Sequence, residues 1–220
     1  MTTHLIILLD RSSSMYETAP LTLQMLNEAQ EQYKQTLPPG SHYTLATFSS
    51  QKDPLLTFVF SHQLLSTVPQ IQPDQYQPEG CTALYDALFK LIAEFENGNE
   101  KTILLIITDG QENDSRHHTR QEIFDKINKL RVERGWEFVF MGANQDAYES
   151  GSQLGIPYNI DYQQDASMPQ LMRSVSHAIS SASHGDHTPL LRMSSRPHKV
   201  LRQDSANLDP PQLKRSYSYQ

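Results

Sequence analysis

Two short, continuous apolar runs constrain the fold of this 220-residue chain more than any other feature. Residues 5–9 read Leu-Ile-Ile-Leu-Leu and are followed by Asp10. Residues 103–107 read Ile-Leu-Leu-Ile-Ile and are followed by Thr108 and Asp109. An uninterrupted apolar run is typical of a strand that is buried on both faces of a parallel sheet. The sequence therefore predicts a covered sheet in which two strands end at acidic residues.

The segments around these runs alternate between strand and helix patterns. We expect strands at residues 4–9, 42–49, 55–60, 102–108, 137–142 and 157–161, and helices at residues 18–36, 83–96, 119–133, 146–153 and 167–183. The link between the second and third strands is short, so these two strands should pair antiparallel, because a parallel pair needs a long crossover. The predicted fold class is α/β: a doubly wound, Rossmann-like, mostly parallel six-stranded sheet with one antiparallel edge strand and helices on both faces.

Composition changes at about residue 183. We expect residues 1–183 to form one folded domain and residues 184–220, which are rich in Ser and Pro, to form a disordered basic tail. The tail carries six Lys or Arg against three Asp, so its net charge of +3 leaves −10 for the rest of a chain of net −7. An acidic domain argues against nucleic acid as a partner.

Neither a membrane segment nor a disulfide is expected. No stretch is long and apolar enough to span a bilayer. The first residues lack the basic segment of a signal peptide. Cys81 is the single cysteine, so no internal disulfide can form. These features predict a cytoplasmic protein that does not act at a membrane, with a secreted protein without disulfides as the open alternative.

Five oxygen-bearing side chains come where strands of the predicted sheet end. With the strand order 3-2-1-4-5-6, the first strand lies beside the fourth, and ligands bind outside their carboxyl ends. Asp10 and Asp109 would then face one crevice. Ser12 and Ser14 would join them from the loop after the first strand, and Thr82 from a later loop. Carboxylates and hydroxyls are hard oxygen ligands, so this set suits Mg²⁺ or Mn²⁺ better than zinc, which favours Cys and His.

The pattern Asp10-x-Ser12-x-Ser14, then Thr82, then Asp109 resembles the metal-ion-dependent adhesion site (MIDAS) of von Willebrand factor A (vWA) domains. All five positions match, and the resemblance covers the whole predicted domain. It implies that Ser12, Ser14 and either Thr82 or Asp109 contact the metal directly. Asp10 would act through water, and a Glu or Asp from a partner would complete the metal's ligands.

The resemblance implies a binding module, an intracellular adaptor that engages an acidic residue of a protein partner through Mg²⁺. Intracellular members of this family often act as adaptors, sometimes beside AAA+ ATPases or in metal-insertion and stress-response complexes. Two alternatives from other classes stay open. One is a structural or assembly protein that binds through its tail or a metal-independent surface, and the other is a Mg²⁺-dependent hydrolase. The chain lacks a phosphate-binding Gly-rich loop, a Gly-x-Ser-x-Gly elbow and a placed general base, so we predict that it is not an enzyme.

Two further groups of polar residues have ordinary structural explanations. Asp86 could support the site without contacting the metal, but a favourable charge in the first turn of a helix explains this residue as well. The residues His177, His184 and His187 straddle the boundary between domain and tail, so we do not expect them to form a metal cluster.

Overall fold

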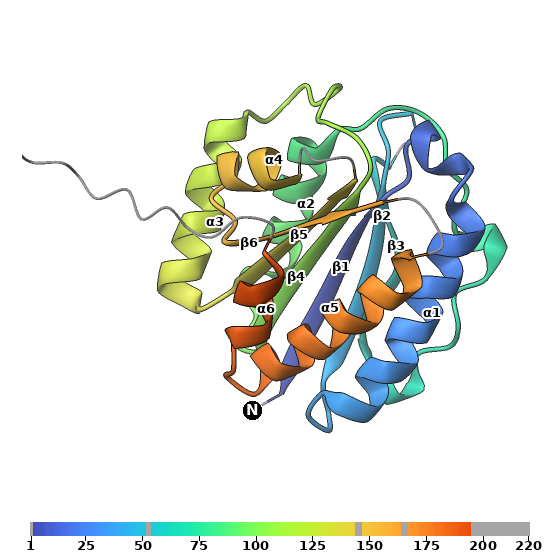
Figure 1. Ribbon diagram of the computed structural model, residues 1–220. Coiled ribbons are helices and arrows are strands. Elements are labelled where there is room, and N and C mark those ends of the chain that lie inside the picture. Colours follow the sequence, from blue (N-terminus) through green and yellow to red (C-terminus); the bar gives the residue numbers. More distant parts are fainter. Residues whose placement is uncertain (1, 52–53, 144–146, 164–166, 195–220) are drawn as a thin grey trace, which may run out of the picture.

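A computed structural model describes the chain except for residues 1, 52–53, 144–146, 164–166 and 195–220 (Figure 1). Within the described residues, six strands form one sheet in the order β3-β2-β1-β4-β5-β6. The strands are β1 (Thr3–Asp10), β2 (His42–Phe48), β3 (Leu56–Leu64), β4 (Lys101–Thr108), β5 (Glu137–Ala143) and β6 (Tyr158–Tyr162). All neighbouring pairs are parallel except β2 and β3, which are antiparallel. The predicted fold class is confirmed, including the antiparallel edge strand.

Helices cover both faces of this sheet (Figure 1). They are α1 (Ala19–Thr36), α2 (Leu84–Phe95), α3 (Arg120–Arg134), α4 (Ala147–Gln153), α5 (Met168–Ser183) and α6 (Thr188–Met193), with 3-10 turns η1 (Ser13–Tyr16), η2 (Leu65–Thr67) and η3 (Pro73–Gln75). The helices α1, α5 and α6 pack into one apolar core, and α2 and α3 pack into the other. The molecule therefore has three layers, with the sheet in the middle.

The central strand β1 explains why a continuous apolar run was present. All eight of its residues are buried. Side chains at positions 5, 7 and 9 contribute to the core under α1 and α5, whereas those at positions 6 and 8 contribute to the core under α2 and α3. Because successive residues of a strand point to opposite faces, both sets must be apolar when helices cover both faces.

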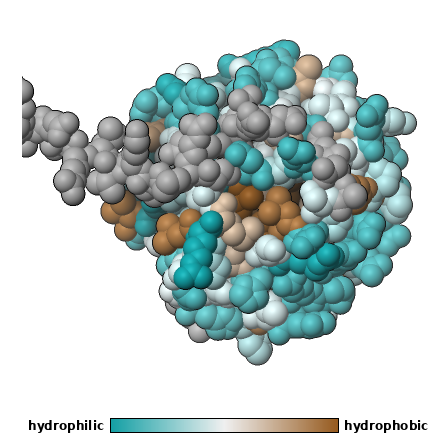
Figure 2. All heavy atoms as spheres, in the orientation of Figure 1, coloured by the Kyte–Doolittle hydropathy of each residue, from teal (hydrophilic) through white to brown (hydrophobic). Residues whose placement is uncertain are grey.

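The outer surface is mostly polar on the face that carries α1 and α5. Figure 2 shows hydrophilic residues over most of this face and a smaller apolar area near its middle. This distribution is expected of amphipathic helices whose apolar sides are buried. Among the described residues, none of the helices has both the length and the apolar character needed to cross a bilayer.

The fold extends past the predicted end of the domain at residue 183. After a short turn, α6 begins with Pro189 in its first turn and inserts Leu190, which is fully buried, into the core beside α5. The prediction of disorder directly after residue 183 is corrected accordingly. A six-residue helix with one buried side chain has too few positions to show helical periodicity in the sequence. The rest of the predicted tail, from residue 195, lies outside the described residues.

Candidate metal centre

Asp10 is the last residue of β1, and its side chain is buried. Its Oδ1 accepts a hydrogen bond from the N–H of Ser12 (2.7 Å), and its Oδ2 accepts one from the Thr108 hydroxyl (2.6 Å). The Thr82 hydroxyl also points to Oδ2, at 3.5 Å. Burial raises the pKa of Asp10 to about 6, although the hydrogen bonds from Thr108 and Ser12 act to lower it. A nearby cation would favour the charged form of this buried carboxylate, so the environment of Asp10 fits one.

A tight turn after β1 brings two serine hydroxyls together. Ser12 has an extended backbone (φ −69°, ψ 163°), and η1 begins at the next residue. The Oγ atoms of Ser12 and Ser14 are 3.0 Å apart, and the Ser14 hydroxyl donates to Oδ1 of Asp109 over 2.6 Å. Asp109 directly follows β4, which pairs with β1. The strand order therefore brings residues from two distant loops into one cluster.

The loop that carries Thr82 is held against both neighbouring loops by hydrogen bonds. The N–H of Ser13 donates to the Gly80 carbonyl (2.9 Å), and the N–H of Thr82 donates to Oδ1 of Asn113 (3.0 Å). The N–H of Asn113 in turn donates to the Thr82 carbonyl (3.0 Å). Gly110 passes so close that a Cβ at this position would lie 3.2 Å from the Thr82 hydroxyl oxygen. These contacts fix the Thr82 side chain in the same crevice as the two aspartates.

All five residues selected from the sequence thus lie at one edge of the sheet, the carboxyl ends of β1 and β4 with the loop before α2. Hydroxyl and carboxylate oxygens, the donor set that Mg²⁺ and Mn²⁺ prefer, face one another here. The Ser14 hydroxyl donates to Asp109 and the Thr82 hydroxyl points to Asp10. A cation would replace such hydrogen bonds by drawing the same oxygens toward itself. Metal binding by these residues stays a prediction.

Two residues that the sequence analysis did not select also support Asp10. Thr108 donates to its carboxylate and accepts a hydrogen bond from the N–H of Gly110 (3.2 Å). Tyr76 donates its hydroxyl to the Asp10 carbonyl over 2.8 Å. A signal for Thr108 was present, because it is the polar residue that ends an apolar run. Tyr76 lies in an irregular Pro-rich segment, where no sequence pattern indicates its role.

Asp86 holds the long loop after β4. It lies in the first turn of α2 and is buried, and its carboxylate accepts hydrogen bonds from the backbone N–H groups of Arg116 (2.8 Å), His117 (3.1 Å) and His118 (2.8 Å). Burial raises the pKa of Asp86, but these backbone hydrogen bonds outweigh it and lower the pKa overall. Asp86 therefore supports the loop that begins at the candidate ligand Asp109, in addition to being a first-turn charge.

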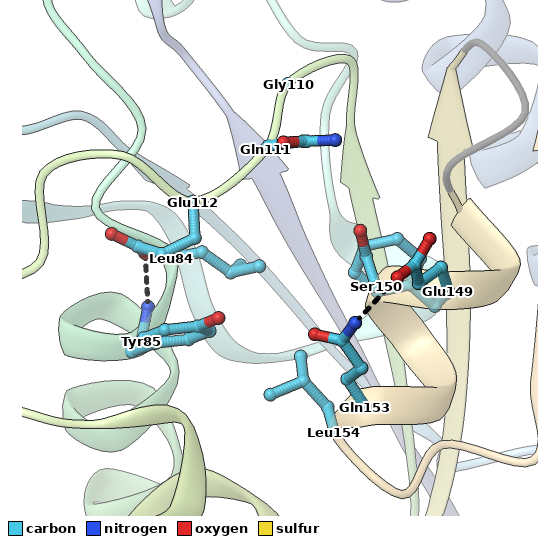
Figure 3. Close-up of a pocket in the computed structure, with 10 residues that line it drawn as sticks. Leu84, Tyr85, Gly110, Gln111, Glu112, Glu149, Ser150, Gln153 and Leu154 are labelled. Atoms are coloured by element: carbon cyan, nitrogen blue, oxygen red, sulfur yellow. Dashed lines mark hydrogen bonds between the residues drawn. The ribbon is translucent and has the colours of Figure 1, made fainter.

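A pocket of about 200 Å³ opens beside this edge of the sheet (Figure 3). Gly110, Gln111 and Glu112 form one side, and residues of α2, α4 and β5, with Leu154 just after α4, form the others. The carboxylate of Glu112 accepts a hydrogen bond from the Tyr85 N–H (3.1 Å), and Gln153 donates to Glu149 (3.1 Å). Two carboxylates in its lining make the pocket suited to groups that donate hydrogen bonds.

Residues 5–111 match the family model of the von Willebrand factor type A domain. This stretch of the chain is similar to a vWA domain. The matched range begins in β1 and ends just after Asp109, so it contains all five candidate metal-site residues. Proteins with vWA domains are mostly adhesion and interaction modules and not enzymes.

Solved structures share this fold. Proximal thread matrix protein 1 from the mussel byssus has a TM-score of 0.60 and 18% identity, covering 81% of this chain and 46% of that one. The same mussel protein with a zinc-occupied MIDAS motif has a TM-score of 0.57 and 18% identity, over 83% and 46% of the two chains. A von Willebrand factor type A protein from Catenulispora acidiphila has a TM-score of 0.56 and 14% identity, over 84% and 43%. At such identities the likeness shows the fold alone.

The chain spans less than half the length of these three structures. A comparison with curated proteins gives no match.

Proposed function

We propose that this vWA domain is a protein-binding module that uses Mg²⁺ or Mn²⁺ to engage an Asp or Glu of a partner protein. The observation that carries the proposal is the hydrogen-bonded cluster of Ser12, Ser14 and Asp109 beside the buried carboxylate of Asp10. Two carboxylates and three hydroxyls leave a divalent ion with enough positive character to attract a further carboxylate.

The five residues divide into two groups by their surroundings. Ser12, Ser14 and either Thr82 or Asp109 are the proposed direct ligands. Asp10 already accepts hydrogen bonds on both carboxylate oxygens, which suits a residue that acts on the metal through water. When bound, the ion would supply the attraction for the partner's carboxylate, while the domain supplies shape and position.

The proposed cellular compartment and the proposed partner rest on family resemblance and composition. We propose a cytoplasmic adaptor, because Cys81 is an exposed free thiol and a reducing compartment keeps such a thiol unmodified. An AAA+ ATPase or a stress-response complex is the proposed kind of partner. Because the domain is acidic, its metal is the feature that would make an acidic partner residue bind.

Zinc is a competitor for the same site. Hydroxyl and carboxylate ligands favour Mg²⁺ or Mn²⁺, but the mussel relative holds zinc at its MIDAS motif. Metal identity should therefore be measured with all three ions.

The first experiment is calorimetric titration of the untagged protein with Mg²⁺, Mn²⁺ and Zn²⁺, with thermal melting alongside. The test variant is Asp109→Ala, and the matched control is Asp125→Ala, an exposed aspartate on α3. An ion at about 100 times its dissociation constant should add about 2.7 kcal/mol to the free energy of unfolding. We expect Mg²⁺ or Mn²⁺ binding by the wild type and the control but not by Asp109→Ala.

The second experiment tests partner binding. Proteins captured by the wild type with Mg²⁺ are compared with those captured in EDTA and by Asp109→Ala. Partners that depend on the proposed site should be lost in both comparisons. Capture that is unchanged by EDTA and by the substitution would contradict the proposal.

A further inference from the structure

A second cluster of side chains that can ligate a metal lies at the other end of the strands, where β1, β2 and β4 begin. It contains His4 at the start of β1, His42 at the start of β2, His62 near the end of the antiparallel strand β3, and Glu100 directly before β4. This is the end of β1 that carries the N label in Figure 1. Four separate segments therefore bring three imidazoles and one carboxylate together, far from the carboxyl ends of β1 and β4.

Glu100 links two of these histidines. Its Oε2 lies 2.6 Å from Nε2 of His62, and its Oε1 lies 2.8 Å from Nδ1 of His42. The rings of His42 and His62 are stacked, with centroids 4.0 Å apart and planes 10° from parallel. The ring centroids of His4 and His62 are 4.7 Å apart, and the two ring planes are nearly perpendicular.

Three of the residues converge in a way that fits a metal ion. One ligand atom from each of His4, His62 and Glu100 lies within 4.8 Å of the other two. Ligands of a tetrahedral zinc ion, with bonds of about 2.0–2.1 Å, are about 3.3 Å apart. Small side-chain rotations would bring the three ligand atoms from their present separation to this shorter one. His62 is exposed, so an ion can enter from solvent, whereas His4 is buried and fixed by its neighbours.

The backbone at His62 is arranged to point this side chain into the cluster. His62 has a φ of +46°, and among the described residues it is the one non-glycine with a positive φ. The pairing of β2 with β3 is irregular at this point, and the N–H of His62 donates to the hydroxyl of Thr44 (2.9 Å). The same hydroxyl lies 2.8 Å from Nε2 of His4. Bulges commonly redirect a side chain at functional sites, and strained backbone is enriched there.

The charge states of the cluster agree with metal binding, which needs neutral imidazoles and an ionised carboxylate. Burial, with a smaller effect of His62, lowers the pKa of His4 to about 3, so its ring is neutral at physiological pH. Burial raises the pKa of Glu100, but the hydrogen bonds from His62 and His42 outweigh it and lower the pKa overall. Glu100 is therefore ionised at neutral pH.

We propose that His4, His62 and Glu100 form a second metal site, separate from the aspartate and hydroxyl cluster, that binds Zn²⁺ or a similar transition ion. Two imidazoles and a carboxylate are a ligand set that zinc accepts, whereas Mg²⁺ prefers oxygen ligands alone. His42 is a positioning residue, because its Nδ1–H orients the Glu100 carboxylate. The ion would tie the edge strand β3 to β1 and to the start of β4, so the site stabilises the fold.

The test uses untagged protein in the Asp109→Ala background, which removes the proposed Mg²⁺ site. Zn²⁺ binding is measured by calorimetry, and Co²⁺ binding by the visible absorption that a tetrahedral cobalt site shows. Two variants remove a ligand: His62→Asn, because Asn tolerates positive φ, and Glu100→Gln, which keeps the shape of the side chain. The matched control is His177→Gln, an exposed histidine on α5.

We expect one Zn²⁺ per chain in the background variant and in the control. Each ligand variant should bind at least ten times more weakly and lose the cobalt absorption. Thermal melts in EDTA should be close to that of the background, which shows that the variants are folded. Absence of Zn²⁺ binding in the background variant, or binding that survives either ligand substitution, would overturn this site.

Discussion

The Ser14 hydroxyl donates a 2.6 Å hydrogen bond to Oδ1 of Asp109, a residue 95 positions later in the chain. The contact exists because β1 and β4 are parallel neighbours and end at the same edge of the sheet. It joins the loop after β1 to the loop after β4, so the proposed metal ligands depend on one another. Substitutions in the supporting residues should therefore change both stability and metal binding.

Thr108→Val should lower the free energy of unfolding by about 1–3 kcal/mol and weaken Mg²⁺ binding. Valine has a similar shape but cannot donate the 2.6 Å hydrogen bond to Oδ2 of Asp10, so a buried carboxylate loses a donor. Urea denaturation and calorimetry measure the two effects.

Thr22→Val on α1 is the matched control for this substitution. Thr22 is fully buried, and its hydroxyl has no hydrogen-bond partner among the described residues. Its replacement should leave stability unchanged or slightly improved and should not affect Mg²⁺ binding. Equal stability of Thr108→Val and the wild type would show that the Thr108 hydrogen bond does not support Asp10.

Gly80→Ala should destabilise the protein by about 2–3 kcal/mol and weaken Mg²⁺ binding. Gly80 has a φ of +79°, and a Cβ there would lie 2.6 Å from the Ser49 hydroxyl oxygen and 2.7 Å from Cβ of Gln51. The Gly80 carbonyl also accepts the hydrogen bond from Ser13, so a shift of this loop would disturb the neighbouring serines. Chemical denaturation and calorimetric titration measure the effects.

Gly135→Ala is the control for Gly80→Ala. It measures the loss of stability from a positive φ without any steric clash. Gly135 ends α3 with a φ of +65°, and a Cβ there would meet nothing within 4 Å. We expect a loss of about 1 kcal/mol from the left-handed conformation alone and unchanged Mg²⁺ binding. If the two alanine variants lose the same free energy of unfolding, the close contacts at Gly80 do not contribute to the destabilisation.

The convergence of Asp10 and Asp109 could be predicted from the sequence because apolar runs buried on both faces mark the central strands of a parallel sheet. Once the strand order is assumed, the ends of β1 and β4 must meet. The support from Tyr76 could not be predicted in the same way, since it comes from an irregular segment and depends on a single long side chain. Its position is decided by tertiary packing.

The histidine cluster also could not be predicted from sequence patterns. Positions 4, 42, 62 and 100 have no regular spacing, and the residues come together only because three strands begin, and the antiparallel β3 ends, at one edge of the sheet. The irregular pairing that turns His62 toward His4 has no sequence signature. A register change of this kind is visible only in the paired strands.

Leu190→Ala should cost about 2–5 kcal/mol, because Leu190 is fully buried in the core beside α5. The adjacent Leu191 is 53% exposed, so Leu191→Ala should change stability by no more than about 0.5 kcal/mol. Thermal or urea unfolding of both variants measures the difference. Similar losses for the two variants would show that α6 is not part of the folded domain.

Asp86→Asn should destabilise the protein at neutral pH by about 2–3 kcal/mol, since the carboxylate accepts backbone hydrogen bonds from Arg116, His117 and His118. An amide of the same shape has one acceptor oxygen and presents N–H groups to the other donors. Asp125→Asn, at an exposed position on α3, is the control and should have little effect.

The pH dependence of this difference identifies its cause. Because the folded-state pKa of Asp86 is lower than its ordinary value of 3.8, its contribution to stability is present above pH 3.8 and is lost as the pH falls through the folded-state pKa. The difference in free energy of unfolding between wild type and Asp86→Asn should therefore be constant from pH 7 to about pH 5 and shrink at lower pH. Urea denaturation at several pH values measures it. A difference that stays constant into the acid range would mean that Asp86 acts through packing, and that the charge of its carboxylate does not hold the loop after β4.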